Sequence, residues 1–165
     1  MLGRESACGR IANSENAFME HEAIEAFLSA VRASGLTPGA PCPADDINAA
    51  GVALGQPVPG DLAELHGLAD GYFDESGQWF VIWPLQRVVH DKLESWKAGT
   101  LAPDLLAFGD DGTGDPFCRA VAGDQPAEIV RWTGSTELSR SEEGTLADFL
   151  RNWVGVNSWP PSAMA

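Results

Sequence analysis

The sequence predicts an α+β fold, with a mostly antiparallel central sheet and helices packed on it. Three observations lead to this class. Apolar residues recur at helical spacing near both ends of the chain, whereas the middle carries short apolar runs typical of strands. Short turns rich in Gly and Asp separate successive strand-like runs, and such turns join antiparallel neighbours. Helices that precede and follow the strands, rather than alternating with them, favour α+β over α/β.

The first predicted helix follows a polar arm of about 14 residues. Its apolar residues lie at i, i+3, i+4 and i+7 and form one stripe: Ile24, Phe27, Leu28 and Val31. Gly35 and Pro38 end this helix, and the Pro-rich segment 37–43 is expected to be extended.

Two further helices are predicted before the first strand. One begins near Asp45, places Ile47 and Leu54 inward and ends at Gly55. The next is short, and its inner face is formed by Leu62, Leu65 and Leu68. The dipeptide Asp70-Gly71 then predicts a turn. A strand is expected at residues 79–83, closed by Pro84, and a mixed helical segment at residues 87–98.

The most informative stretch is the predicted strand-turn-strand unit at residues 105–121. Residues 105–108 and 117–121 are its two strands, and Gly109, Gly112 and Gly114 permit a sharp turn between them. Asp110, Asp111 and Asp115 place three carboxylates in this turn. A hairpin connection leads to a third strand at residues 128–133, and residues 136–139 are expected to add an edge strand. The last helix spans residues 144–154, with one apolar stripe: Leu146, Phe149, Leu150 and Trp153.

Composition bounds the class of protein. A chain of 165 residues with 44% hydrophobic content can bury the core of one domain. It holds no apolar run of membrane-spanning length and no apolar segment typical of a secretory signal near its start, so no membrane association is expected. The three cysteines are odd in number and show no CxxC spacing, which favours free thiols and the reducing cytoplasm.

The net charge of −14 is unevenly distributed along the chain. No Lys or Arg occurs between Arg32 and Arg87, or between Lys97 and Arg119. Such a surface repels phosphate backbones, so nucleic-acid binding is not expected, whereas it attracts a basic protein. The competing interpretation is that the charge only maintains solubility.

No catalytic centre, cofactor or metal site is predicted. Counting from Asp110 or Asp111, the Gly and Glu positions of an EF-hand loop are not filled. The segment starting at His21 begins like a zincin motif but has Glu25 in place of the second His. Asp70, Asp74 and Glu75 are better interpreted as a solvated acidic turn than as paired acid/base carboxylates.

The order of these signals resembles that of the SUKH superfamily. Five motifs support this resemblance: the segment 54–62 (LGQPVPGDL), Asp70-Gly71, the segment 83–85 (WPL), the turn 108–115 (FGDDGTGD) and the segment 145–150 (TLADFL). The resemblance covers roughly residues 45–154, and residues 1–40 have no counterpart in it. Gly51 and Asp70 depart from it, because the family often has Glu and Asn there. It predicts an N-terminal arm and helix at 1–40, a SUKH-like domain at 41–155 and a tail at 156–165, within one domain overall.

The resemblance implies an α+β domain without enzymatic activity. Bacterial members are typically immunity proteins of polymorphic toxin systems, which neutralise toxins delivered between competing cells, and fungal relatives regulate cell-wall assembly through protein contacts. We therefore expect a cytoplasmic immunity protein whose partner is a basic toxin domain; a nuclease is one candidate, because its substrate is anionic. The alternative is an intracellular regulatory or scaffolding module. The residues expected to face the partner are Asp70, Asp74, Glu75, Asp110, Asp111 and Asp115.

Overall fold

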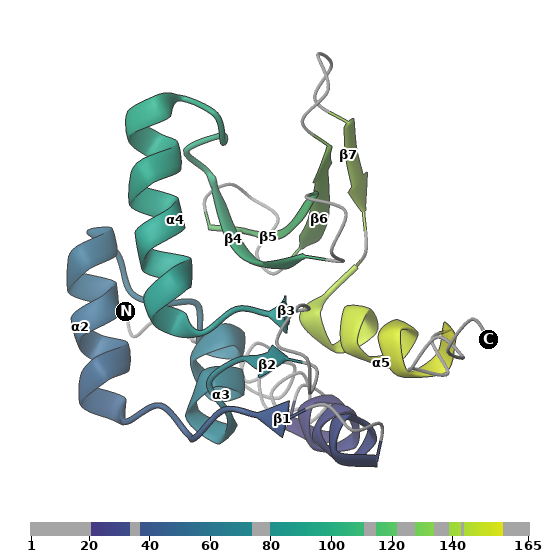
Figure 1. The fold of residues 1–165 in the computed structure, drawn as a ribbon. Coiled ribbons are helices and arrows are strands. Elements are labelled where there is room, and N and C mark those ends of the chain that lie inside the picture. Colours follow the sequence, from purple (N-terminus) through teal and green to yellow (C-terminus); the bar gives the residue numbers. More distant parts are fainter. Residues whose placement is uncertain are drawn as a thin grey trace, which may run out of the picture.

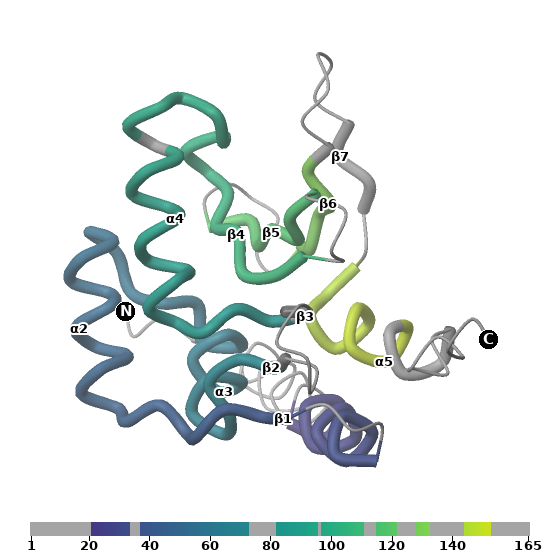
Figure 2. Tube along the Cα trace, in the orientation of Figure 1, coloured from purple at the N-terminus to yellow at the C-terminus, as the bar shows by residue number. Residues whose placement is uncertain are grey.

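Two antiparallel sheets with helices packed against them form the fold, which confirms the predicted α+β class, although a single central sheet was expected (Figure 1). The computed structural model describes residues 21–33, 37–73, 80–110, 115–121, 128–133, 139–142 and 144–156, traced in Figure 2. The smaller sheet has the order β1 (Thr37–Pro38), β2 (Tyr72–Phe73) and β3 (Phe80–Ile82). The larger sheet has the order β4 (Leu105–Asp110), β5 (Pro116–Ala120), β6 (Ile129–Thr133) and β7 (Ser139–Glu142).

Helices pack on both sheets. An unlabelled helix at residues 21–33 is followed by α2 (Ala44–Leu54), α3 (Gly60–Leu68), α4 (Leu85–Ala98) and α5 (Leu146–Val156). Helix α4 contacts α2 on one side and β4 on the other, so it lies between α2 and the larger sheet (Figure 1). The two sheets adjoin where the Trp83 N–H, just after β3, donates to the Phe108 carbonyl of β4 at 2.8 Å.

One hydrophobic core joins these layers. Phe149 of α5 lies edge-on to Phe108 of β4 and Phe117 of β5, with ring centroids 5.8 and 4.7 Å away, so α5 packs against the larger sheet through this side chain. The predicted stripe of the first helix is confirmed, since Ile24, Phe27, Leu28 and Val31 are all buried in the same core. This helix therefore packs as part of the domain. The division near residue 40 remains a prediction, and residues 157–165 of the expected tail lie outside the described part of the chain.

Two details of the strands differ from expectation. Gly109, predicted in the turn, lies within β4 opposite Phe117, beside a register shift, so β4 extends to Asp110. The expected edge strand at 136–139 instead occupies Ser139–Glu142, where it pairs with β6, and residues 136–138 lie outside the described residues. The two-residue strands β1 and β2 were not predicted, because a pair so short has no period-2 pattern to detect.

The segment after β1 runs antiparallel to the two residues just before β2, at very close range. Gly39 donates its N–H to the Gly71 carbonyl at 2.9 Å, and Ala40 accepts from the Asp70 N–H at 3.2 Å. A Cβ at Gly39 would lie only 2.1 Å from the Asp70 carbonyl oxygen. Glycine is therefore required at position 39 for steric reasons.

Lys92 of α4 is a fully buried cation. Its Nζ donates to the carbonyls of Ala102 (3.5 Å), Pro103 (3.2 Å) and Leu105, so it fastens the loop before β4 to the helix. Burial lowers the pKa of Lys92 to about 8, while the negative field of Asp104 opposes that shift.

We expect Gly39→Ala to lower the free energy of unfolding by more than about 2 kcal/mol, because the new methyl group meets backbone that cannot give way. Gly60→Ala is the matched control. An added Cβ at this position, the first of α3, meets nothing within 4 Å, so its effect should stay within about 1 kcal/mol. Urea unfolding followed by circular dichroism measures both variants. Equal effects would show that the backbone at Gly39 and Asp70 is not closely packed.

Lys92 should make stability depend on pH in the mildly alkaline range. Its pKa is about 8 in the folded state and 10.5 as the ordinary value, so the unfolded chain holds more protons between these limits and stability rises with pH there. From about pH 7.5 to 9.5 the unfolding free energy of the wild type should rise by roughly 2 kcal/mol relative to Lys92→Met. Lys97→Met, at an exposed position of the same helix, should leave the slope unchanged. Parallel curves for the wild type and Lys92→Met would contradict the assignment.

Candidate functional site

The structure separates the acids that the sequence singled out. Asp70 lies between α2 and α4, whereas Asp115 lies in a hollow between α4 and the larger sheet. Asp110 accepts a hydrogen bond from Trp83, which lines the same hollow as Asp115. The other three predicted residues, Asp74, Glu75 and Asp111, lie outside the described part of the chain. Helix α4 thus divides the predicted set into two places.

Asp70 holds the start of α4 in position. Its Oδ1 accepts a hydrogen bond from the Leu85 N–H at 2.7 Å, and Leu85 is the first residue of α4. The same oxygen is 2.9 Å from Nδ1 of His66, a fully buried residue of α3. Burial alone would raise the pKa of Asp70, but the hydrogen bonds from His66 and Leu85 outweigh it and lower the pKa. Asp70 is therefore a charged cap on α4, supplied from 15 residues upstream.

Asp110 is also engaged within the protein. The buried indole of Trp83 donates its Nε1–H to Oδ2 of Asp110 at 2.6 Å, as a buried tryptophan N–H requires an acceptor. Arg87 lies 3.7 Å from the same oxygen and stacks over the Trp83 ring. Contacts distant in sequence thus occupy one oxygen of Asp70 and the carboxylate of Asp110, so these two acids are less solvated than expected. Their role in binding a partner stays a prediction.

Side chains from elsewhere in the sequence also engage acids of the base-free segment 33–86. Arg119 of β5 lies 2.8 Å from Asp61 in a largely buried pair, and His21 lies 2.6 Å from Glu64. Asp45 and Asp46 of α2, by contrast, are exposed and form no side-chain hydrogen bond or ion pair with the described residues. The uncompensated charge of this segment, as far as the structure describes it, lies at the start of α2.

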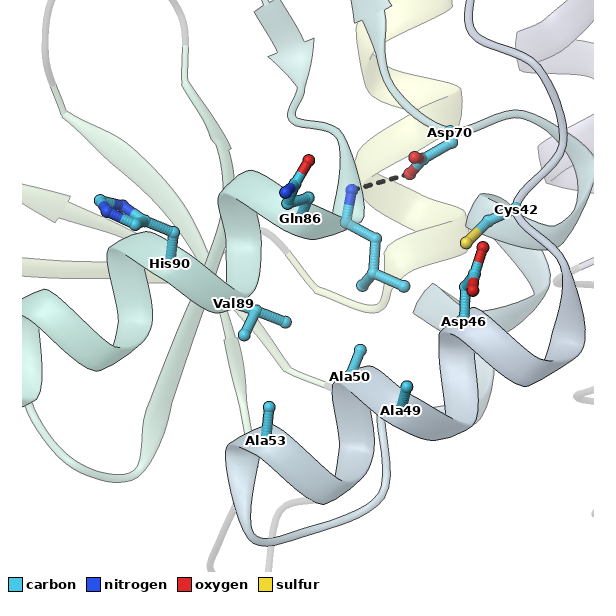
Figure 3. A pocket seen from close by; sticks show the side chains of 10 residues that line it. Cys42, Asp46, Ala49, Ala50, Ala53, Asp70, Gln86, Val89 and His90 are labelled. Carbon is cyan, nitrogen blue, oxygen red and sulfur yellow. Dashed lines mark hydrogen bonds between the residues drawn. The ribbon is translucent and has the colours of Figure 1, made fainter.

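A groove of about 530 Å³ runs between α2 and α4. We call it the α2–α4 groove; it is lined by Cys42, Asp46, Ala49, Ala50, Ala53, Asp70, Leu85, Gln86, Val89 and His90. Figure 3 shows that Cys42, Asp46 and Asp70 gather at one end, while Ala49, Ala50, Ala53 and Val89 line the rest. The groove therefore has an anionic end and an apolar wall.

The acidic end of the groove keeps the Cys42 thiol neutral. Partial burial raises the pKa of Cys42, and the negative fields of Asp70 and Asp46 raise it further. Because the thiolate is the reactive form, Cys42 is a weak nucleophile and at most a soft hydrogen-bond partner.

A second hollow, of about 460 Å³, lies between α4 and the larger sheet. Its walls include Trp83, Trp132 and the acids Asp91, Glu94 and Asp115. Two of these acids already have cationic partners, since Arg87 lies 3.3 Å from Asp91 and Lys97 lies 2.7 Å from Glu94. The α2–α4 groove therefore presents its charge more openly than this hollow does.

Neither a metal-binding cluster nor a histidine that both bonds to Asp70 and lines the groove is found among the described residues. No group of three or more His, Cys, Asp or Glu side chains among them is placed to hold a metal ion. His66 bonds to Asp70 but is fully buried and does not line the groove, so a ligand in the groove would not reach its ring. Nor does any helix of the described ranges combine the length and apolar character needed to cross a bilayer.

Comparison with the known protein families and with curated protein sequences finds no match for this chain. The fold and the groove between α2 and α4 define the class of this protein. It is an α+β protein with an open acidic groove. Sequence reasoning missed Cys42, Asp46 and the alanines of α2 as groove residues. In the sequence, Asp45 and Asp46 suit a helix N-terminus and belong to the base-free acidic segment, but nothing there places either of them in a groove. Small residues on a helix more often indicate close packing than a binding surface.

Loss of the Asp46 charge should make Cys42 more reactive. In Asp46→Asn the thiol pKa falls toward its ordinary value, so alkylation by iodoacetamide near pH 8 should become faster. Asp45→Asn removes the same charge one residue away, outside the groove, and should change the rate less. Mass spectrometry of the Cys42 peptide separates its labelling from that of the other cysteines. Equal rates in the wild type and both variants would exclude an effect of Asp46 on the thiol.

Proposed function

We propose that this protein binds a basic protein toxin and neutralises it, as an immunity protein does. The observation that carries the proposal is the uncompensated negative charge at the start of α2, next to an open groove, on a chain of net charge −14. The motifs that resemble the SUKH superfamily supply the class of partner. A nuclease domain fits this charge, because a surface that binds an anionic substrate is itself basic.

The charge would act mainly during encounter. Complementary fields raise the association rate of a basic partner at low salt, and exposed acids at the rim contribute more to this rate than to the lifetime of the complex. Asp45 and Asp46 are such residues. In contrast, Asp61, which pairs with Arg119 in the interior, contributes to the fold instead.

The direct test is co-expression with a candidate toxin, chosen from the proteins encoded by the neighbouring genes. We expect cells to survive only when both are present, and the two purified proteins to elute as one complex in size-exclusion chromatography. The association rate, measured by surface plasmon resonance, should fall several-fold as salt rises from low to physiological concentration. Asp45→Asn/Asp46→Asn should lower this rate and its salt dependence, with a smaller change in dissociation.

Two outcomes would count against this function. Cell death on co-expression, with no complex between the purified proteins, would exclude neutralisation of that toxin. A pull-down from the producing cell that returns only resident proteins would favour the regulatory or scaffolding module instead.

A further inference from the structure

We propose that the α2–α4 groove captures one lysine side chain of the basic partner, with the ammonium group at the acidic end and the stem along the alanines of α2. The identity of that partner rests on the proposed function, whereas recognition of lysine by the groove can be tested without it.

The acid end offers acceptors that the fold does not use. Asp46 is exposed and has no side-chain partner among the described residues. Asp70 places both of its hydrogen bonds on Oδ1, which leaves Oδ2 as an acceptor on a carboxylate that is 26% exposed. Both charges act on the Cys42 thiol, which lies between them in Figure 3. A cation placed here would meet two carboxylates at once.

The wall of the groove suits an aliphatic chain. Ala49, Ala50 and Ala53 present only methyl groups from α2, and Leu85 and Val89 face them from α4. Lysine packs its four methylene groups against such surfaces while its charged end stays with polar partners. The combination of an apolar wall and a charged end distinguishes this groove from a merely acidic patch.

The charges of the groove favour lysine over other occupants. Among its lining residues only His90 can carry positive charge, and Figure 3 places it at the end away from Asp46 and Asp70. The ammonium group of lysine is compact and has three donors, which matches separate acceptors on Asp46 and Asp70. A guanidinium group is best bound by one carboxylate in a planar two-point contact. One oxygen of Asp70 is already occupied, so only Asp46 could form that contact and Asp70 would contribute little to it.

The test is a titration of the whole ¹⁵N-labelled protein, followed by NMR, with a blocked lysine (N-acetyl-lysine N-methylamide). We expect saturable shifts at millimolar probe concentration, centred on the amides of Asp46, Ala49, Ala53 and Val89. Blocked acetyl-lysine, which has the same stem without the charge, should not bind. Blocked arginine should bind more weakly.

Matched variants separate the groove from the general negative field. Asp46→Asn should abolish the saturable shifts, whereas Asp45→Asn, which removes the same charge outside the groove, should retain them. Ala53→Phe should block the wall, and Ala44→Phe, at an exposed position of the same helix outside the groove, should not. Spectra of the free variants confirm that each remains folded.

The results distinguish this inference from the proposed function. Absence of saturable shifts with blocked lysine, equal loss in Asp46→Asn and Asp45→Asn, or tighter binding of blocked arginine would each overturn lysine capture, while the complex with the toxin would still stand on its own test. If lysine binds but no toxin complex forms, the groove keeps its ligand and the proposed function fails.

Discussion

The hydrogen bonds of Asp70 fix the arrangement of the three helices on this side of the molecule. One oxygen of its carboxylate accepts from His66 of α3 and from the first residue of α4, so two helices that are separated by two strands share one acceptor. The backbone of the same residue donates to Ala40, and its carbonyl oxygen stands against Gly39. The segment that leads into α2 is thereby held at the same point. The position of α2 relative to α4, and hence the width of the groove between them, depends on this junction.

A second junction fixes the other side of α4. The buried ammonium group of Lys92 binds the carbonyls that precede β4, and Asp110 at the end of β4 accepts from Trp83 at the end of β3. Both contacts place charges in poorly solvated surroundings, where they persist only because each has polar partners. Helix α4 is thus held by polar contacts at its first residue and at Lys92 near its middle, with the buried apolar side chain of Val88 between them. This gives two hollows of different character, one on each side of the same helix.

Much of the fold could be predicted from the sequence, because it follows from local periodicity. Local sequence patterns predict the buried stripe that includes Ile24 and Phe27, the end of α2 at Gly55 and the hairpin of β4 and β5. The candidate site could not be predicted in this way. Asp70 and Asp110 are recognisable as acids, but N–H groups that donate to their carboxylates lie 15 and 27 residues away, and only the tertiary structure shows these hydrogen bonds. Asp46 differs from both of them, because its side chain has no hydrogen-bond partner within the described residues and its charge stays exposed.

Helix α2 carries residues of the hydrophobic core and residues that face outward, and most of those that line the groove belong to the second kind. Leu54 and Ala50 are buried in the core, whereas Ala49, Ala53 and Asp46 project from the same helix without contributing to it. Exchanging an outward methyl group for a larger or charged side chain would therefore reshape the groove and leave the interior packing as it is. A domain built in this way can acquire a new binding preference by one substitution, at little risk to its ability to fold.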